Sequence, residues 1–484
     1  MKQFYIIIAK IGVLCLLLLQ CLPATADDVH NRILTRAIKA YKNLQYQEAA
    51  KLLKDVISYK KMSEDLQVEE MLAISLRKLD RVPDATFWYR KLVHSSDPKP
   101  SWFLHYAQLL ASMELYDSAA LYYGKYATLM PADKRGDAFA KAYANIADLK
   151  KGNKQFQVFF TNINTDASEY SPMFYKGGLL FTSNRRINGS VKNVYGWNKS
   201  PYSDIYEVDT LSIILPEEPD SLLADVRRNP NKYRSQLHAL KTAIAEESPG
   251  DNRRMGFYDE SMAGDTLGAI SKIEGVHQFK GSVNSRFHEG STSIGPDGTI
   301  YFTRSSHKRN NFGRSTDGVF RLQIFNTAKN DRGVEPFKYN DEDWSNAHPA
   351  VSKDGLFMIF TSDKPGSVGG TDLYLCTRDK ITSQWNAPVN LGPLINTEGN
   401  EAFSYIDNNG TLFFASDGHP GLGGLDIFSI ALNPNTHRPE GTVTHLGAPV
   451  NSPKDDFGFI WSDEWNKGYF SSNRRGNDDI YIVK

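Results

Sequence analysis

Cysteine is almost absent from this chain, with three in 484 residues. Two of them, Cys15 and Cys21, lie near the N-terminus, which leaves Cys376 without a partner for an internal disulfide. No disulfide framework therefore holds the fold. Cys376 follows the apolar run Leu373–Leu375, so we expect a buried structural thiol there and not a nucleophile.

An excess of charge of either sign is also missing. The 56 Lys and Arg residues balance the 56 Asp and Glu residues, for a formal net charge of +0 at pH 7. A balanced chain gives no electrostatic case for nucleic acid as a partner. We therefore expect none.

Familiar catalytic motifs are lacking as well. The sequence contains no Gly-x-Ser-x-Gly nucleophile elbow, no His-Glu-x-x-His and no paired-cysteine metal signature. We therefore expect no enzyme, no catalytic residue, no metal site and no cofactor.

The N-terminus carries a long apolar stretch. Basic residues precede the run Ile11–Leu22, and Ala24-Thr25-Ala26 supplies the small residues of a cleavage site. This pattern predicts a secretory signal peptide over residues 1–26, and hence an exported, periplasmic protein. A lipid anchor at Cys21 is the alternative to cleavage after Ala26, and it would tether the chain to a membrane.

Residues 27–152 have the pattern of helices, because apolar positions recur at intervals of three and four while Pro and Gly are scarce. The segment also repeats. Ala49, Ala85 and Ala119 are 36 and 34 residues apart, and a large apolar or aromatic residue follows each of them four positions later. This resembles the tetratricopeptide repeat and implies an α-solenoid with a groove for peptides or partner proteins. A helical spacer without a free groove is the alternative.

Residues 153–484 change to short strand-like runs separated by turns, and one pattern occurs there five times. Each copy starts with Asn or Asp and has an acid or Asn five residues later; the third starts at Asp341. A run ending in an apolar–small–small step follows, such as Phe181-Thr182-Ser183, and then an acidic or glycine step leading two apolar residues, such as Asp426-Ile427-Phe428. A repeat of roughly 50–60 residues of this kind predicts the blades of a β-propeller.

The second position of the repeat gives five candidate site residues, called the ring residues below. In a closed propeller they would surround one mouth of the central channel, where clustered carboxylates attract cations or ligands. Joints between blades repeat whereas active sites usually do not, so we interpret the ring as structural, with carboxylates that accept backbone N–H bonds. The ring residues are Glu169, Glu289, Asn346, Glu401 and Asp456.

Two further features concern how the blades are completed. The chain ends after the third strand of its last blade, and Phe156–Phe160 is an orphan strand, so we expect it to close the ring by pairing with Asp479–Val483. The first two copies of the repeat are farther apart in the sequence than the later copies. Most of the extra residues lie in Leu211–Gly250, a stretch that is charged and helix-prone. We interpret it as a helical insertion near 211–250; a degenerate sixth blade is the alternative.

The strand landmarks resemble the WD40-like, TolB-type propeller repeat, most closely at Ser171-Pro172, Ser183-Asn184-Arg185 and Ser472-Asn473-Arg474. With the export signal and the helical repeats, the chain further resembles the periplasmic, outer-membrane-associated proteins of type IX secretion and gliding systems. Those proteins usually continue into a carboxypeptidase-regulatory-like module and an OmpA-like peptidoglycan-binding domain. The sequence stops at the propeller, so we do not expect direct peptidoglycan anchoring.

Together these features predict an α + β multidomain protein, with a tetratricopeptide α-solenoid followed by an all-β propeller of five blades, or six. The leading interpretation is a non-enzymatic exported scaffold of a cell-envelope assembly. It would recognise protein partners through the helical groove and a propeller face, without a small-molecule or cation ligand. The alternative is a glycan-binding or glycosidase-like propeller with carboxylates at the channel mouth. Five equivalent acids fit poorly the two carboxylates, about 5–10 Å apart, that a glycosidase needs.

Overall fold

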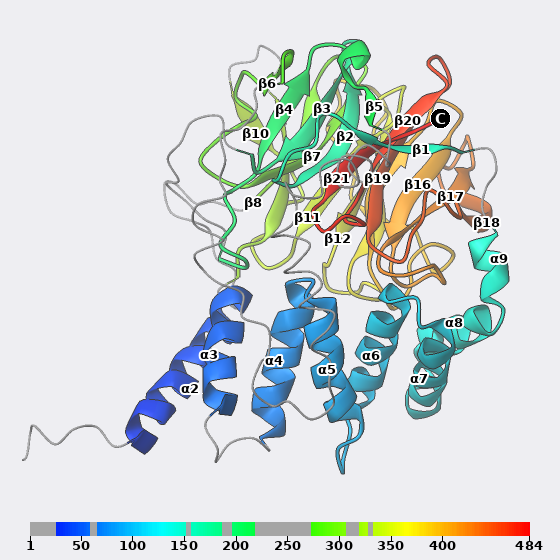
Figure 1. The fold of residues 1–484 in the computed structure, drawn as a ribbon. Coiled ribbons are helices and arrows are strands. Elements are labelled where there is room, and N and C mark those ends of the chain that lie inside the picture. The colour runs from blue at the N-terminus through cyan, green and yellow to red at the C-terminus, as the bar shows by residue number, and fades with distance from the viewer. Residues whose placement is uncertain are drawn as a thin grey trace, which may run out of the picture. The chain divides into compact units, whose positions relative to one another are not determined.

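A computed structural model describes residues 26–58, 65–151, 156–185, 196–217, 273–305, 319–327 and 333–484 (Figure 1). The predicted signal peptide up to residue 25, the alternative lipid anchor at Cys21 and most of the predicted insertion lie outside these residues. Within the described residues, no helix is both long enough and apolar enough to pass through a membrane.

The N-terminal region is helical, as the periodicity predicts. The helices are α2 (Ala26–Lys42), α3 (Tyr46–Ser58), α4 (Leu66–Lys78), α5 (Val82–Val93), α6 (Pro100–Ser112), α7 (Tyr116–Leu129), α8 (Lys134–Ala144) and α9 (Ile146–Lys150). Residues 1–98 and 196–199 form one compact unit, which holds α2–α5. Residues 99–195 and 200–484 form a second, which holds α6–α9 and the propeller.

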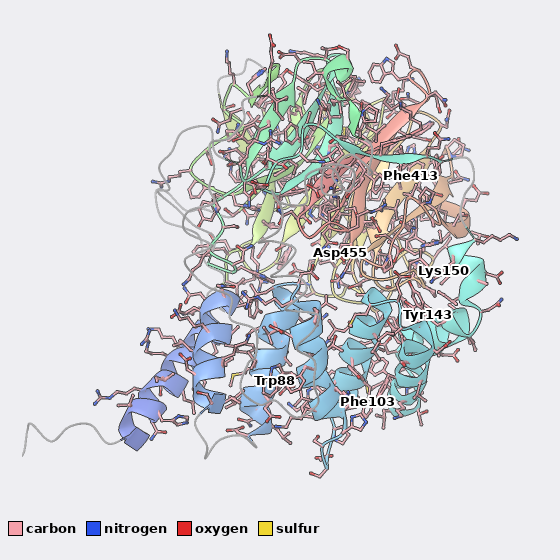
Figure 2. All side chains as sticks on the ribbon, viewed as in Figure 1. Trp88, Phe103, Tyr143, Lys150, Phe413 and Asp455 are labelled. Atoms are coloured by element: carbon pink, nitrogen blue, oxygen red, sulfur yellow. The ribbon has the colours of Figure 1, made fainter. Side chains whose placement is uncertain are left out.

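The repeated alanines explain how neighbouring helices pack. Ala49, Ala85 and Ala119 have no exposed surface, and a small side chain at such a position lets two helix axes approach closely. Within the second unit, Tyr143 of α8, labelled in Figure 2, makes edge-on ring contacts with Tyr116 and Tyr123 of α7. The helical character is therefore confirmed, and membership of the tetratricopeptide family stays a prediction.

The rest of the second unit is a propeller of five antiparallel sheets, which confirms the five-bladed prediction. The four complete blades in chain order are β2 (Glu169–Tyr175), β3 (Gly178–Ser183), β4 (Asp204–Val208) and β6 (Val276–Gln278); β7 (Glu289–Ile294), β8 (Ile300–Ser305), β9 (Leu322–Thr327) and β10 (Val334–Pro336); β11 (Asn346–Val351), β12 (Phe357–Ser362), β13 (Asp372–Thr377) and β14 (Val389–Asn390); β15 (Glu401–Ile406), β16 (Thr411–Ser416), β17 (Asp426–Leu432) and β18 (Pro439–His445).

The fifth blade joins the two ends of the propeller sequence. It contains β19 (Asp456–Ser462), β20 (Lys467–Ser472), β21 (Asp479–Val483), β1 (Val158–Thr161) and β5 (Pro216–Glu217). Strand β1 lies antiparallel beside β21, with Val158 opposite Val483 and Phe160 opposite Tyr481 (Figure 1). The predicted ring closure is thus confirmed.

The start of the predicted insertion is only partly helical. A short 3₁₀-helix at Leu211–Ile213 is followed by β5, which pairs with the outer edge of β1. These residues therefore extend the closing blade, and the remainder of the insertion lies outside the described residues.

Asparagine side chains tie each blade to the linker that follows it. Each one accepts from the N–H and donates to the C=O of the same residue in the third strand of a blade, so it substitutes for a missing strand neighbour. The pairs are Asn164 with Ile480, Asn284 with Ile205, Asn340 with Ile324, Asn396 with Leu373, and Asn451 with Ile427. The sequence pattern starts the third repeat at Asp341. The structure places the clamp on Asn340, because the Asp341 carboxylate accepts a turn bond from the Asp343 N–H instead.

Candidate functional site

Each ring residue is the first residue of the first strand of its blade. The side chains are buried, with exposed fractions of 0% for Glu169, Glu289, Glu401 and Asp456 and 1% for Asn346. They are therefore not open to a ligand, and the question is what they bond to.

In the first and last blades the ring carboxylate is held by an arginine from the loop after the second strand. Glu169 accepts from the Thr165 N–H at 2.8 Å, and its carboxylate lies 3.0 Å from the Arg185 guanidinium. Asp456 pairs with Arg474 in the same way. Arg185 is 8% exposed and bonded to Glu169, so it is not a free surface charge.

In the second blade an arginine also pairs with the ring carboxylate, but it comes from a different position in the sequence. Arg304 occupies the place of the final small residue of the strand, and its Nε donates to Glu289 at 2.7 Å. The guanidinium also donates to the Val283 carbonyl at 2.9 Å. Desolvation by burial nevertheless raises the pKa of Glu289 to about 7, against the lowering effect of Arg304.

The third and fourth blades lack this ion pair. Asn346 is neutral and donates to the Tyr339 carbonyl at 2.8 Å. Glu401 accepts from the Thr397 N–H and from two hydroxyls, at 2.7–2.9 Å, and no basic side chain among the described residues pairs with it. Burial raises the pKa of Glu401 to about 7. All five ring residues are thus engaged in bonds inside the protein.

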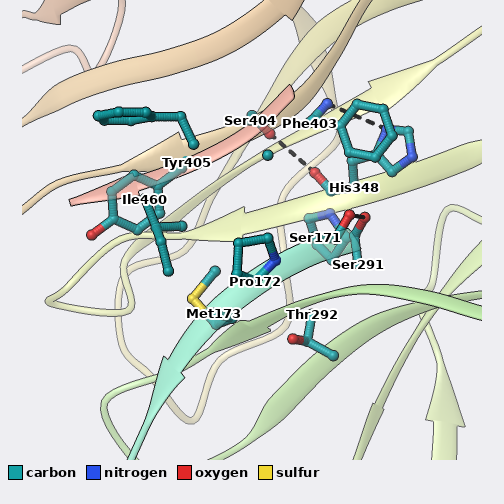
Figure 3. A pocket seen from close by; sticks show the side chains of 13 residues that line it. Ser171, Pro172, Met173, Ser291, Thr292, His348, Phe403, Ser404, Tyr405 and Ile460 are labelled. Atoms are coloured by element: carbon teal, nitrogen blue, oxygen red, sulfur yellow. Dashed lines mark hydrogen bonds between the residues drawn. The ribbon is translucent and has the colours of Figure 1, made fainter. Parts of the chain in front are cut away.

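A pocket opens where the first strands of the five blades meet (Figure 3), two to four residues beyond the ring residues. Every one of these strands has an irregular register at this point. Ser171, His348 and Phe403 adopt left-handed backbone conformations there, with φ of 53°, 52° and 51°. Such a conformation costs a residue other than glycine about 1–3 kcal/mol of conformational free energy, and residues in it are often found at binding sites.

The polar groups of the pocket are mostly hydroxyls. The Ser171 and Ser291 hydroxyls share a hydrogen bond of 2.9 Å, and the Ser404 hydroxyl donates to the His348 carbonyl at 3.0 Å. Thr292 differs from them. Its side chain is 4% exposed, and its Oγ1 has no hydrogen-bond partner among the described residues. A buried hydroxyl without a partner costs free energy, and a ligand could restore the bond.

His348 and Phe403 form the aromatic part of the pocket. Their rings are stacked, with centroids 3.9 Å apart and planes 17° apart, and Figure 3 shows the Phe403 N–H directed at the His348 ring. That N–H donates to Nδ1 at 3.3 Å, so the neutral imidazole carries its proton on Nε2. Burial lowers the pKa of His348 to about 3, which keeps the ring neutral.

In each blade the residue two positions after the ring residue lines the pocket. A comparison restricted to the acidic positions of the repeat does not consider these residues. The residues at this position are Ser171, Ser291, His348, Phe403 and Gly458. In the described part of the chain, no cluster of His, Cys, Asp and Glu is arranged to hold a metal ion.

No protein-family model matches the chain, and no curated protein matches it. Among solved structures it is similar to a thermostable family-43 glycoside hydrolase (10% identity, TM-score 0.32, covering 67% of this chain and 91% of that one). It is also similar to the α-L-arabinofuranosidase of Lactobacillus brevis (11%, 0.31, 65% and 90%) and to a protein of unknown function from Dyadobacter fermentans (10%, 0.33, 68% and 82%).

These comparisons contradict the leading functional interpretation of the sequence. Glycoside hydrolases recur among the similar structures, so the expectations of a non-enzymatic scaffold and of no enzyme are not supported. Identities of 9–16% and TM-scores of 0.24–0.33 concern the fold alone. The residues that would carry such a function must therefore be argued from the pocket itself.

Proposed function

We propose that the protein binds a glycan by placing a sugar unit at the mouth of the pocket between the five blades. The observation that carries this proposal is the Thr292 hydroxyl, which is buried in the pocket wall without a partner. The sequence-based expectation of no small-molecule ligand considers only the ring residues, whereas other residues line this pocket.

The remaining lining supports the same ligand chemistry. A sugar presents hydroxyls that both donate and accept, together with C–H faces that pack on aromatic rings. The Ser171, Ser291 and Ser404 hydroxyls retain lone pairs for the first kind of contact, and Tyr405 provides a ring for the second. A few polar groups set in an apolar wall are typical of ligand sites.

The pocket is small, with a volume of about 20 Å³, which is room for about one water molecule. We therefore propose that one hydroxyl of the sugar enters, with the sugar ring at the mouth and the rest of the glycan outside. Hydrolysis would require two carboxylates beside the bound sugar, and the described lining residues include none. Release of reducing ends from a bound glycan would extend the proposal from binding to turnover.

Thr292→Val tests the proposal, because valine keeps the shape of threonine and removes its hydroxyl. We expect glycan affinity to fall about 2- to 10-fold, the loss of one hydrogen bond, and the melting temperature to hold or rise. Thr182→Val is the matched control, since Thr182 Oγ1 is also buried without a partner but lies outside the pocket. The readouts are calorimetric titration with a glycan found on an array and thermal unfolding. Equal glycan affinity in wild type and Thr292→Val would contradict the proposal.

Export to the periplasm, outer-membrane association, protein partners in the envelope and kinship with tetratricopeptide and TolB-type proteins of type IX secretion are further proposals, and they rest on sequence resemblance. A glycan-binding propeller is compatible with an address in the cell envelope. Mass spectrometry of the N-terminus of the exported protein tests the first step. A chain beginning at Asp27 supports cleavage after Ala26, and a lipid-modified Cys21 supports the anchor.

A further inference from the structure

We infer that the start of α3 and the end of α4 form a binding site for a protein segment that carries a tryptophan and, two residues later, a basic side chain. Residues 196–199 of this chain occupy the site and compete with a partner segment of the same kind. The inference does not depend on the glycan proposal, since none of these residues lines the pocket.

The occupying segment comes from the connection between β3 and β4 of the first blade, yet residues 196–199 belong to the compact unit of α2–α5. Trp197 makes the main contacts. Its ring lies edge-on to the Tyr46 ring, with centroids 4.6 Å apart and planes 78° apart. The Lys78 ammonium lies 5.6 Å from the centre of the Trp197 ring, a cation–π contact. A tryptophan from a distant part of the sequence is thus held between two helices.

The two helix ends supply the hydrogen bonds of the site. The first N–H groups and the last C=O groups of a helix have no partner within that helix. At the start of α3, the Gln47 N–H donates to the Trp197 carbonyl at 3.1 Å. At the end of α4, the Lys78 carbonyl accepts from the Trp197 indole N–H at 2.8 Å. The site therefore favours tryptophan over phenylalanine and tyrosine, which carry no ring N–H.

The charge of the site favours a basic residue two positions after the tryptophan. Lys199 Nζ lies 3.0 Å from the Glu48 carboxylate in the first turn of α3. The Lys199 side chain is 54% exposed, and an exposed ion pair adds little to stability. The segment can therefore leave the site without a large loss of free energy, and a partner segment can replace it.

The other copies of the helical repeat lack this combination of groups. When the repeated alanines are aligned, Gln47 corresponds to Pro83 in the second copy, and proline has no N–H to donate. Glu48 corresponds to Ser118 in the third copy, which has no charge to attract a lysine. The site is thus particular to the first copy, whereas a contact needed only for packing the repeats would recur.

Trp197→Ala tests the inference, because it removes the indole from the site in the full chain. The probe is a fluorescently labelled peptide with the sequence of residues 194–201, and anisotropy measures its binding. We expect the variant to bind the peptide at least tenfold more tightly than the wild type, whose own segment competes at a high effective concentration. Equal affinity in the two proteins, or no binding by a folded variant, would overturn the inference.

Trp465→Ala is the matched control, since Trp465 is 38% exposed and lies in the turn between β19 and β20. It should bind the peptide as weakly as the wild type. Lys199→Asn covers the case in which Trp197→Ala impairs folding, because asparagine removes the charge and tolerates the φ of 61°. We expect it to bind the peptide at least twofold more tightly than the wild type. Unchanged affinity would overturn the proposed competition.

The backbone donor is tested in the Trp197→Ala background. Gln47→Pro removes the N–H, and proline should fit because Pro83 takes the same place at the start of α5. We expect a threefold or greater loss of peptide affinity, whereas Gln47→Ala, which keeps the N–H, should lose less than twofold. Equal losses in the two variants would overturn the role of the Gln47 N–H.

The remaining occupant to test is the same segment of a second copy of this chain. We expect the wild type to be a monomer by light scattering, with the site filled from within. Dimers that Trp197→Ala dissociates would assign the site to the second copy and overturn the competition within one chain.

Discussion

At the scale of single residues, the ring carboxylates show how burial and pairing compete. Arg185 and Arg474 reach their carboxylates from a loop, and Arg304 reaches Glu289 from a strand. Glu401 has no such partner. In its blade Gly418 takes the position of the arginine, and His419 instead lies 2.7 Å from the Ile395 carbonyl. The fourth blade therefore buries a carboxylate whose charge only hydroxyl and N–H donors stabilise.

The raised pKa of Glu401 predicts a pH-dependent stability. Its folded-state pKa of about 7 lies above the unfolded value of about 4.3. The folded state therefore binds more protons than the unfolded state between these pH values, and stability falls as pH rises through this window. Glu289 and Asp479, also with pKa values of about 7, act in the same direction.

We expect Glu401→Gln to flatten the decline of the melting temperature between pH 5 and pH 8. At pH 8 the variant should gain up to about 3 kcal/mol of stability relative to its own pH 5 value, compared with wild type. Calorimetric unfolding at several pH values measures this, and exposed Glu464→Gln is the control. An equal pH slope in wild type and Glu401→Gln would show that Glu401 is ionised in the folded protein.

At the scale of elements, each blade depends on a segment outside its first three strands. The asparagine clamps fix the linker against the third strand, and β1 completes the last blade from the other end of the propeller sequence. The irregular register of each first strand then turns side chains toward the pocket. The same irregularity thus recurs in the first strand of every blade. The residues at it differ from blade to blade, and these residues line the pocket.

Asn451→Ala tests the clamp, because Asn451 is 2% exposed and makes both bonds to Ile427. Removing it leaves a buried N–H and C=O without partners, so we expect a loss of about 2–4 kcal/mol in unfolding free energy. Urea unfolding measures the change, with exposed Asn435→Ala as control. A loss no larger than that of the control would mean that the clamp adds nothing to stability.

At the scale of the whole molecule, the second compact unit includes helices α6–α9 as well as the five blades. Tyr116 of α7 is 5% exposed, and its hydroxyl donates to the Leu422 carbonyl in the fourth blade at 2.8 Å. The backbone N–H of Lys134 donates to Glu398 at 3.3 Å. These helices therefore cover loops of the propeller, whereas the sequence predicts a domain boundary at 152/153.

We expect the fragment 99–484 to unfold in one transition, and the fragment 153–484 to melt at a lower temperature because it exposes the apolar surface that α6–α9 cover. Calorimetric unfolding of the two fragments measures the difference. Equal melting temperatures would favour the boundary predicted from sequence.

The sequence by itself determined the propeller architecture, the closing strand and the helical N-terminal region, and the structure decided between five blades and six. These follow from local periodicity and from landmarks that every copy of the repeat must carry, such as the buried phenylalanines Phe181 and Phe302. Tertiary structure decided the partners of the arginines, the identity of Asn340 as a clamp, and the pocket. Contacts across the pocket join residues of different blades, such as Ser171 with Ser291 and His348 with Phe403. Only the packing of neighbouring blades brings these side chains together, so their chemistry has no signature in the linear repeat.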